Sequence, residues 1–196
     1  MEVLPTLENM IGSFDDVSES ALKMIAQAAS PAHYAKGDYL IRSGTVCRQL
    51  FFLQKGIVRG FVSDGKKEVT TWLTAEGEMA TAIRSFIKQQ PTGENVQAIE
   101  ACYVLAISYD ELYHLLEKFP KLNVVVRKIL EQYYCDAEER AYIIRLSNAR
   151  VKYDYFLATK GNLVNRLPLK YIASYLGMTL ETLSRMRTKI SQKKVS

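Results

Sequence analysis

The segment 169–188, LKYIASYLGMTLETLSRMRT, combines side chains that are suited to reading duplex DNA. Glu181 and Arg185 stand four residues apart, so on a helix they project from one side, where a carboxylate and a guanidinium can meet base edges. Hydroxyl and basic side chains around them can reach phosphates. The predicted DNA contacts are Thr179, Glu181, Thr182, Arg185, Arg187, Lys189 and Lys170, and Arg166, Lys193 and Lys194 are further expected phosphate contacts.

Three of these residues have more specific expected roles. Arg185 is predicted to donate two hydrogen bonds to a guanine, a contact that contributes about 1–3 kcal/mol of base discrimination. Glu181 either accepts from a cytosine amino group or orients Arg185 as an i, i+4 pair, and the sequence favours neither role. Thr179 can cap the helix that follows it and can also reach a phosphate.

The apolar residues of the same segment predict a helix-turn-helix. Ala173 is small enough for two helices to cross closely, and Gly177 readily adopts the positive φ that a tight turn needs. An ordinary helical hairpin with a basic surface is the alternative. The side chains expected to close the corner between the helices are Ile172, Leu176, Met178, Leu183 and Met186.

Charge is distributed unevenly along the 196 residues. Residues 1–146 carry 16 Lys or Arg and 19 Asp or Glu, a net charge of −3, whereas residues 147–196 carry ten basic and two acidic side chains, a net charge of +8. A strongly basic end is typical of a protein that binds a polyanion, with salt-dependent phosphate contacts. Taken alone, it could also be a solvated basic tail.

Upstream of the basic end, the chain changes from a helical to a strand-like pattern and back. Ser18 precedes a helical run that Pro31 ends. Short apolar runs within residues 33–107, separated by glycine-containing turns, predict many short antiparallel strands, and residues 79–90 are expected to hold a short helix. An apolar stripe without proline or glycine then spans residues 121–147 and predicts a long helix. Its stripe packs on its own domain or forms a seam with a second copy.

These features resemble those of the Crp/Fnr superfamily of bacterial transcription regulators over nearly the whole chain. The helix-turn-helix and the phrases FLQKGIVRGFV and LTAEGEMA carry the resemblance, with Gly56 expected to turn a strand pair. The resemblance implies an α+β fold with an N-terminal, cyclic-nucleotide-binding-like β-roll and flanking helices. A long dimerisation helix and an all-α helix-turn-helix domain would follow. The implied domains are an effector domain (1–119), the dimerisation helix (120–147) and a DNA-binding domain (148–196).

The same resemblance implies partners. Members of the family bind double-stranded DNA as homodimers through the long helix and read two major-groove half-sites about one helical turn apart. RNA polymerase and a small-molecule effector are further expected partners. In the family's recognition pattern, Glu181 and Arg185 match, but Leu180 replaces the first polar residue. We therefore expect the half-site preference to differ at the base which that residue would read.

The resemblance also identifies an effector site with one essential departure. Gly77-Glu78 matches the Gly-Glu that opens the family's phosphate-binding cassette, but the arginine that holds the phosphate is replaced by Pro91-Thr92-Gly93-Glu94. A phosphate buried beside Glu94 without a cation would be unfavourable by several kcal/mol. We therefore expect that cAMP is not bound in the usual manner and that Glu78 stabilises a turn. The candidate effector contacts are Gly77, Glu78, Met79, Arg84, Thr92 and Asp136.

Composition excludes several classes of protein. No run approaches the ~18–20 apolar residues of a membrane span, and the N-terminal MEVLPTLENM lacks the features of a secretory signal. These observations predict a cytoplasmic protein without membrane contact. Three cysteines and two histidines without metal-ligand spacing predict free thiols, no metal and no cofactor. No nucleophile–base arrangement or P-loop stands out, so we do not expect an enzyme.

One alternative function stays open. The chain could be a sensor or adaptor with a cyclic-nucleotide-domain-like fold that acts through protein contacts and has only vestigial DNA binding. The sequence ends at Ser196, soon after the second helix of the motif, so the β-hairpin wing common in the family is expected to be missing or very short. That expectation favours the alternative, whereas the basic C-terminal quarter argues against it.

Overall fold

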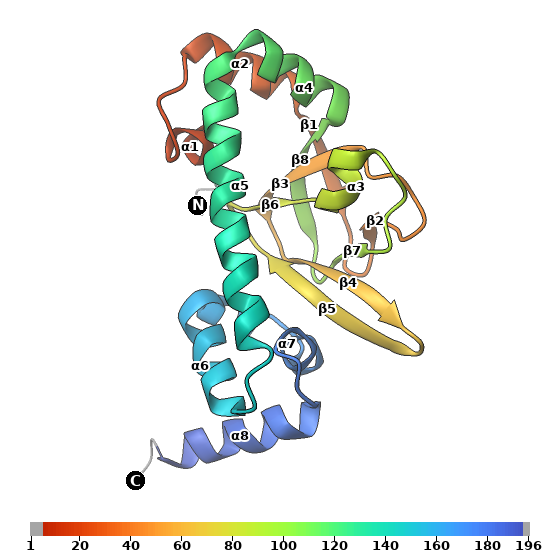
Figure 1. Cartoon of the computed structure of the whole chain (residues 1–196), viewed down its shortest axis with the longest axis vertical. Helices are drawn as coiled ribbons and strands as arrows, with labels where there is room; N and C mark the ends of the chain where they lie inside the picture. Colours follow the sequence, from red (N-terminus) through yellow and green to blue (C-terminus); the bar gives the residue numbers. More distant parts are fainter. Residues whose placement is uncertain (1–5, 194–196) are drawn as a thin grey trace.

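A β-roll packs along one side of a long helix, and a smaller helical unit lies at the far end of that helix (Figure 1). The structure is a computed structural model that describes residues 6–193, with side chains through Thr188. Within this range no helix is both long enough and apolar enough to cross a membrane. The observed class is α+β, as predicted.

Two four-stranded antiparallel sheets form the roll. Their strand orders are β1-β8-β3-β6 and β2-β7-β4-β5. Gly56, at φ +103°, makes the turn between β3 and β4, as predicted, and an added Cβ there would lie 2.6 Å from Cys102 Sγ. The strands are β1 (Ser30–Tyr34), β2 (Tyr39–Ile41), β3 (Gln49–Lys55), β4 (Val58–Asp64), β5 (Lys67–Thr74), β6 (Met79–Ala80), β7 (Asn95–Ala98) and β8 (Cys102–Ser108).

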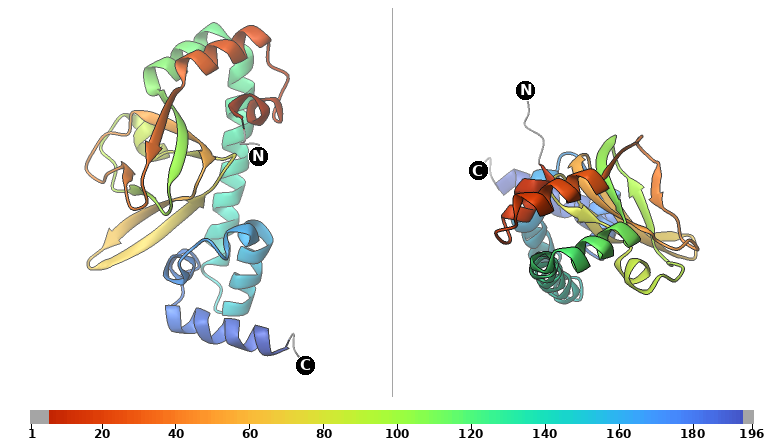
Figure 2. Two further views of the ribbon diagram at one scale, coloured as in Figure 1. Left: turned by 180° about the vertical axis from the view of Figure 1, so that it is seen from behind. Right: turned by 90° about the horizontal axis from the view of Figure 1, so that it is seen from above.

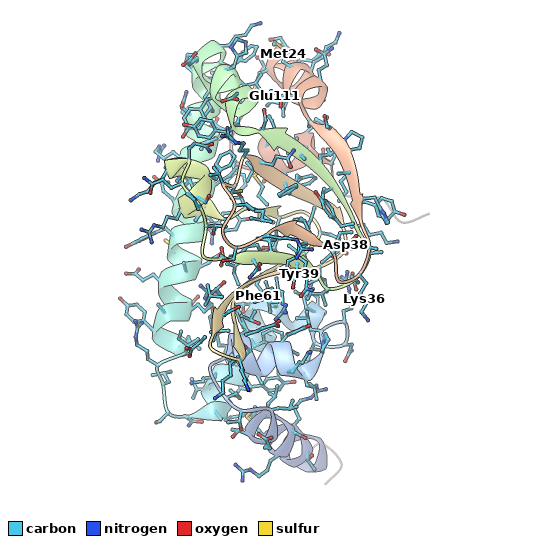
Figure 3. The ribbon with its side chains drawn as sticks, turned by 90° about the vertical axis from the view of Figure 1, so that its right-hand side faces the viewer. Met24, Lys36, Asp38, Tyr39, Phe61 and Glu111 are labelled. Carbon is cyan, nitrogen blue, oxygen red and sulfur yellow. The ribbon has the colours of Figure 1, made fainter. Side chains whose placement is uncertain are left out.

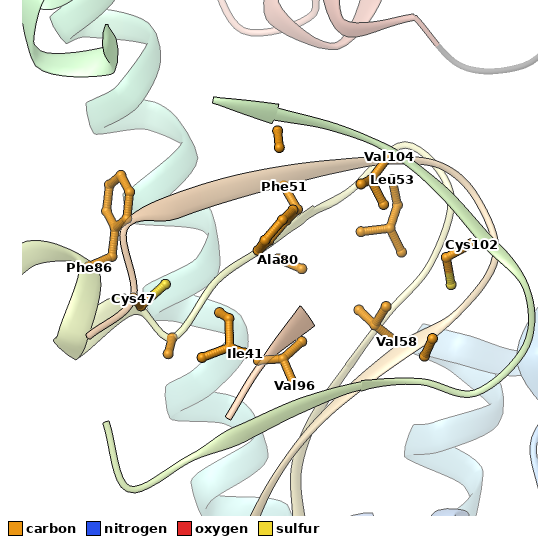
Figure 4. Close-up of a cluster of buried hydrophobic side chains, with 13 residues drawn as sticks. Ile41, Cys47, Phe51, Leu53, Val58, Ala80, Phe86, Val96, Cys102 and Val104 are labelled. Atoms are coloured by element: carbon orange, nitrogen blue, oxygen red, sulfur yellow. The ribbon is translucent and has the colours of Figure 1, made fainter. Parts of the chain in front are cut away.

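Apolar side chains from both sheets fill the space between them (Figure 4). Phe51 and Leu53 from β3 meet Val58 and Val96 from the opposite sheet, and all four are completely buried. Burial of this kind stabilises the fold by roughly 1.5–3 kcal/mol per large side chain. The interior of the roll is therefore a packed hydrophobic core.

Helices flank the roll at both ends of the domain. Ser18 caps α2, in agreement with its place before the predicted helical run, and Ser108 forms a capping box with Glu111 at the start of α4. The helices are α1 (Leu7–Gly12), α2 (Glu19–Ala28), α3 (Ile83–Lys88), α4 (Tyr109–Lys118), α5 (Pro120–Ile143), α6 (Ala149–Lys160), α7 (Leu169–Tyr175) and α8 (Leu180–Lys193), with a 3-10 helix, η1, at Gly161–Leu163.

Two boundaries differ from the sequence expectation. Strand β1 begins at Ser30 and includes Pro31, whereas the sequence predicts only that Pro31 ends a helix. Strand β1 lies at the edge of its sheet, and an edge strand tolerates proline because one side of it needs no hydrogen-bond donor. The long helix ends at Ile143, four residues before the expected end, and the chain leaves it as a short turn.

Helix α5 is anchored to its own roll along one face. Leu122, Val125 and Ile129 are buried there in a cluster with α1, α2 and α4. Further along, the hydroxyl of Tyr133 accepts a hydrogen bond from the Met79 N–H (2.9 Å) and lies 3.2 Å from the Met79 carbonyl oxygen, to which it donates. The helix is thus a fixed spine rather than a free arm.

Candidate nucleic-acid interface and effector cavity

Helices α7 and α8 form the predicted helix-turn-helix at the far end of α5 (Figure 1). Ile172, Leu176 and Leu183 are completely buried at the corner, and Ala173 is buried where the helices meet. Gly177 has φ +59° in the turn, as its position in the sequence predicted. Met178 and Met186 are partly buried against the same cluster.

Thr179 caps α8. Its hydroxyl oxygen accepts from the Thr182 N–H at 3.2 Å, and its hydroxyl donates to the Thr182 hydroxyl at 3.1 Å. This cap satisfies one of the unpaired donors at the start of the helix. Thr182, a predicted DNA contact, is half-buried, and its hydroxyl accepts from the Thr179 hydroxyl of this cap.

The solvent-facing side of α8 forms one stripe. Arg185 and Glu181 lie on it, whereas Thr182 and Arg187 are half-buried at its margins. Ser184 and Thr188 complete it, at i, i+4 spacing from Leu180. The exposed stripe consists of Leu180, Glu181, Ser184, Arg185 and Thr188.

Glu181 and Arg185 do not pair in this structure. No ion pair between them occurs among the residues described here, although they stand one turn apart. The backbone N–H of Glu181, and to a smaller extent the nearby Thr179 side chain, hold the pKa of the Glu181 carboxyl below its usual value. The carboxylate is therefore ionised at neutral pH and positioned at the N-terminus of α8.

The expected phosphate contacts separate into different environments. Lys170 is exposed, with its ammonium 4.9 Å from the centre of the Tyr171 ring. Arg166, by contrast, is held by Glu76 and Glu100 of the roll, so its guanidinium does not face solvent freely. Lys189 and Lys193 lie on α8 with side chains outside the described part, and Lys194 lies beyond it.

The turn before β6 carries the predicted effector residues. Gly77 has φ +83°, and the carboxylate of Glu78 accepts from the Ala75 N–H (2.9 Å) and from the Lys160 ammonium (3.3 Å). Both acceptor oxygens of Glu78 are therefore engaged by the protein itself. This geometry agrees with the expected turn-stabilising role of Glu78.

Four of the six candidate effector residues lie together. Gly77, Glu78, Met79 and Asp136 all line a small recess of about 160 Å³ beside Tyr133. The structure does not bring the other two there. Arg84 is exposed on α3, and the Thr92 hydroxyl accepts from the Glu94 N–H within its own turn.

A carboxylate occupies the region where the sequence lacks an arginine. Glu94 accepts from the Thr71 hydroxyl at 2.5 Å and is also hydrogen-bonded by the Trp72 indole. Burial raises the pKa of Glu94, and these hydrogen bonds together with the charge of Arg140 only partly oppose the increase. A phosphate placed here would meet an acidic group instead of a cation.

A larger cavity of about 710 Å³ opens between α5 and the roll. Its wall is mostly apolar, and Trp72, the single tryptophan of the chain, forms part of it. Arg140 and Lys160 are the only basic side chains on the described part of its wall. This volume lies within the roughly 300–1,000 Å³ typical of small-molecule sites, so a ligand of moderate size would fit.

Residues 31–119 match the profile of the cyclic nucleotide-binding domain. The transcriptional activator protein FnrA of Stutzerimonas stutzeri is 27% identical over 169 residues, which cover 80% of this chain and 68% of FnrA. The fumarate and nitrate reduction regulatory protein of Vibrio cholerae is 25% identical over 164 residues, covering 77% of this chain and 64% of that protein. These matches support assignment of the chain to the Crp/Fnr superfamily. The chain spans about two thirds of the length of these Crp/Fnr relatives.

Solved structures share the Crp/Fnr architecture. The c-di-GMP responsive regulator CLP of Xanthomonas campestris superposes with a TM-score of 0.68 at 16% identity, over 90% of this chain and 93% of CLP. A CooA mutant of Carboxydothermus hydrogenoformans gives a TM-score of 0.71 at 18% identity, over 97% of this chain and 87% of CooA. The TM-scores show that this chain shares its fold with both proteins.

Proposed function

We propose that this chain is a homodimeric, sequence-specific DNA-binding transcription regulator, and not an enzyme, acting in the cytoplasm on double-stranded DNA. The observation that carries the proposal is the exposed stripe of α8, where a guanidinium, a carboxylate and two hydroxyls project from one side of a capped helix. That arrangement suits major-groove base edges. The net charge of +8 after residue 146 supports phosphate contact, and relatives named as transcriptional activators support the regulatory role.

We further infer that two copies associate along α5. Val126, Leu130, Tyr133 and Ala137 follow 4-3-4 spacing, which places them on one stripe of the helix, and Ile144 extends this stripe just past the end of α5. Leu130 is 42% exposed and Ile144 38%, and the ring of Tyr133 is 39% exposed although its hydroxyl bonds Met79 of the roll. Leu122, Val125 and Ile129, by contrast, are buried. The stripe borders the large apolar cavity, so a second α5 would cover both.

The partners follow from this arrangement. Activation would require contact with RNA polymerase. The effector is not a cyclic nucleotide held in the usual manner, since Glu94 stands where a phosphate would need a cation and Glu78 is already engaged. The sensor or adaptor alternative is less supported, because the polar stripe of α8 has no protein partner in the described chain that would explain it.

DNA reading is tested by selecting duplexes from a random pool with the wild-type protein and measuring binding by fluorescence anisotropy. Arg185→Ala should lose about 1–3 kcal/mol for the selected site and lose preference at one base pair. Lys170→Ala should weaken all sequences alike and reduce the salt slope by about 1. Arg84→Ala, which removes the same charge from exposed α3, is the control and should bind as wild type. A pool that yields no enriched duplex contradicts the proposal.

Dimerisation is tested by sedimentation. Leu130→Glu places a charge in the α5 stripe and should give single copies at micromolar concentration. Tyr142→Glu is the control, because Tyr142 is 63% exposed on a different side of α5. Dissociation of both variants, or of neither, would contradict the proposal that two copies associate along the α5 stripe.

A further inference from the structure

One hydrophobic cluster joins the roll to the helix-turn-helix of the same chain. Side chains from the loops and strand ends of the roll pack directly against α6, α7 and η1. Leu73 is 3% exposed and Ile57 is completely buried, as are Phe156 and Ile172 on the other side. The cluster comprises Ile57, Leu73, Ala75 and Ile99 from the roll with Tyr153, Phe156, Leu163, Leu167, Ile172, Ala173, Tyr175, Leu176 and Leu183.

Helix α7 also completes the edge of a sheet. Strand β5 is the outer strand of its sheet, and its free edge faces α7; Figure 2 shows the β4–β5 hairpin beside the helical unit. Ser174 accepts from the Thr70 N–H at 2.9 Å and donates to the Glu68 carbonyl oxygen at 3.1 Å. A single side chain thus pairs both a donor and an acceptor of the exposed strand edge.

Charged groups reinforce the contact. The Arg166 guanidinium donates to Glu76 at 3.0 and 2.5 Å and also contacts Glu100. Both acids lie on the roll, at turns separated by more than 20 residues in sequence. Burial alone would raise the pKa of Glu76, but hydrogen bonds from Arg166 and from the Gly56 N–H outweigh it and lower that pKa.

A buried arginine forms the third contact. Arg59 on β4 is 1% exposed, and its guanidinium lies 3.9 Å from the centre of the Tyr171 ring on α7 and 4.1 Å from that of Phe61. Phe61 in turn lies beside Tyr39 on the roll (Figure 3). Glu68 and Gln97 hold the same guanidinium in place. We call the hydrophobic cluster together with these three polar sets, centred on Ser174, Arg166 and Arg59, the interdomain clasp.

The clasp leaves the reading stripe free. It uses α6, α7 and η1, whereas the stripe of α8, with Leu180 44% exposed, points away from the roll. Outside the clasp, the helical unit contacts the rest of the chain through the segment 144–148 and the Lys152 bond to the Ile144 carbonyl oxygen. The Arg140 guanidinium of α5 also lies 5.5 Å from the centre of the Tyr175 ring, and Lys160 pairs with Glu78. Without the clasp, the orientation of α8 relative to α5 would rest on those few residues.

We propose that the β-roll braces the helix-turn-helix in cis, and that the interdomain clasp holds α8 in its DNA-binding orientation without a bound effector. This inference rests on the proposed function. A dimer must present two reading helices at one spacing, and a helical unit that is already fixed loses less conformational freedom on binding. A loosened unit would have to be ordered by the DNA, which lowers affinity.

The test changes only the roll, so that the DNA-binding residues stay intact. Glu76→Gln with Glu100→Gln removes both acids that hold Arg166. The matched control is Glu117→Gln with Glu131→Gln, which removes the same charge from the exposed surfaces of α4 and α5. For each protein, free of added ligand, one measures affinity for the selected duplex and hydrogen exchange at the Thr70 amide, the donor to Ser174.

We expect the wild type and the control to bind alike. The clasp variant should exchange the Thr70 amide faster and bind roughly three- to tenfold more weakly. Tighter DNA binding by the clasp variant would show that the clasp holds α8 in an orientation that disfavours DNA binding. Unchanged DNA binding with faster exchange would show that the clasp does not affect affinity. Either result contradicts the proposal that the roll braces the helix-turn-helix. A wild type that enriches no duplex overturns the proposed function itself, an outcome distinct from both.

Discussion

The ammonium of Lys152 on α6 donates to the Ile144 carbonyl oxygen, just past the end of α5, at 2.7 Å. The same ammonium lies 3.3 Å from the Gly177 carbonyl oxygen, in the turn of the helix-turn-helix, to which it also donates. Lys152 is only 6% exposed, so a buried cation neutralises the end of one helix and the turn between two others. It fixes the junction between the spine and the reading unit.

Lys152→Met keeps the length of the side chain but removes this charged donor. We expect a loss of about 1.5–3 kcal/mol in the free energy of unfolding, because two partly buried hydrogen bonds from a charged donor are lost. Urea unfolding followed by circular dichroism measures the change. Lys23→Met, at an exposed position of α2, should leave the midpoint where it is; an equal shift in both variants would argue against a special role for Lys152.

Acid should weaken the contribution of Glu76. Its pKa in the folded state lies below the usual value of 4.5, so the stabilisation is present above that value and is lost as the pH falls through the lower folded pKa. We therefore expect Glu76→Gln to be less stable than wild type at pH 7 and to approach it at pH 3. Unfolding midpoints of both proteins at the two pH values provide the measurement. A gap that stays constant with pH would contradict the ion pair.

Thr70 offers a way to strengthen the clasp. Its hydroxyl is the only buried side-chain oxygen or nitrogen without a hydrogen-bond partner among the residues described. Thr70→Val has nearly the same shape and suits a strand, so removing the unpaired hydroxyl should stabilise the chain by up to about 1–3 kcal/mol. Thermal unfolding tests this, with Thr71→Val as the comparison, because the Thr71 hydroxyl is paired with Glu94 and its loss should destabilise.

Cyclic AMP should not bind in the cavity. Trp72 is the single tryptophan and lines that cavity, so its fluorescence reports ligands there. A ligand at 100 times its dissociation constant would add about 2.7 kcal/mol to stability, which a thermal shift detects. With millimolar cAMP we expect neither a saturable fluorescence change nor a thermal shift. Either signal, if abolished by Arg140→Gln, would show that a phosphate is accepted despite Glu94.

The sequence by itself determined the local elements of this protein. Helix caps such as Ser18, the turn glycines Gly56 and Gly177, and the apolar spacing around Ile172 specify structure through neighbours in the chain, so their outcome could be predicted. The residues that form the helix-turn-helix, and the replacement of the family's arginine by Pro91-Thr92-Gly93-Glu94, could be read from the sequence for the same reason.

Only the tertiary structure decided which charges serve the reading surface and which serve the fold. In sequence, Arg166 was one more basic residue near the reading helix, yet it pairs with Glu76 and Glu100, 90 and 66 residues away. Lys152, likewise a basic residue near the reading helix, is buried between α5 and the helix-turn-helix, where its ammonium donates to the Ile144 carbonyl oxygen. The spacing of residues along a chain encodes helix and strand faces, but the partner of a long flexible side chain depends on which distant surfaces packing brings within hydrogen-bond reach.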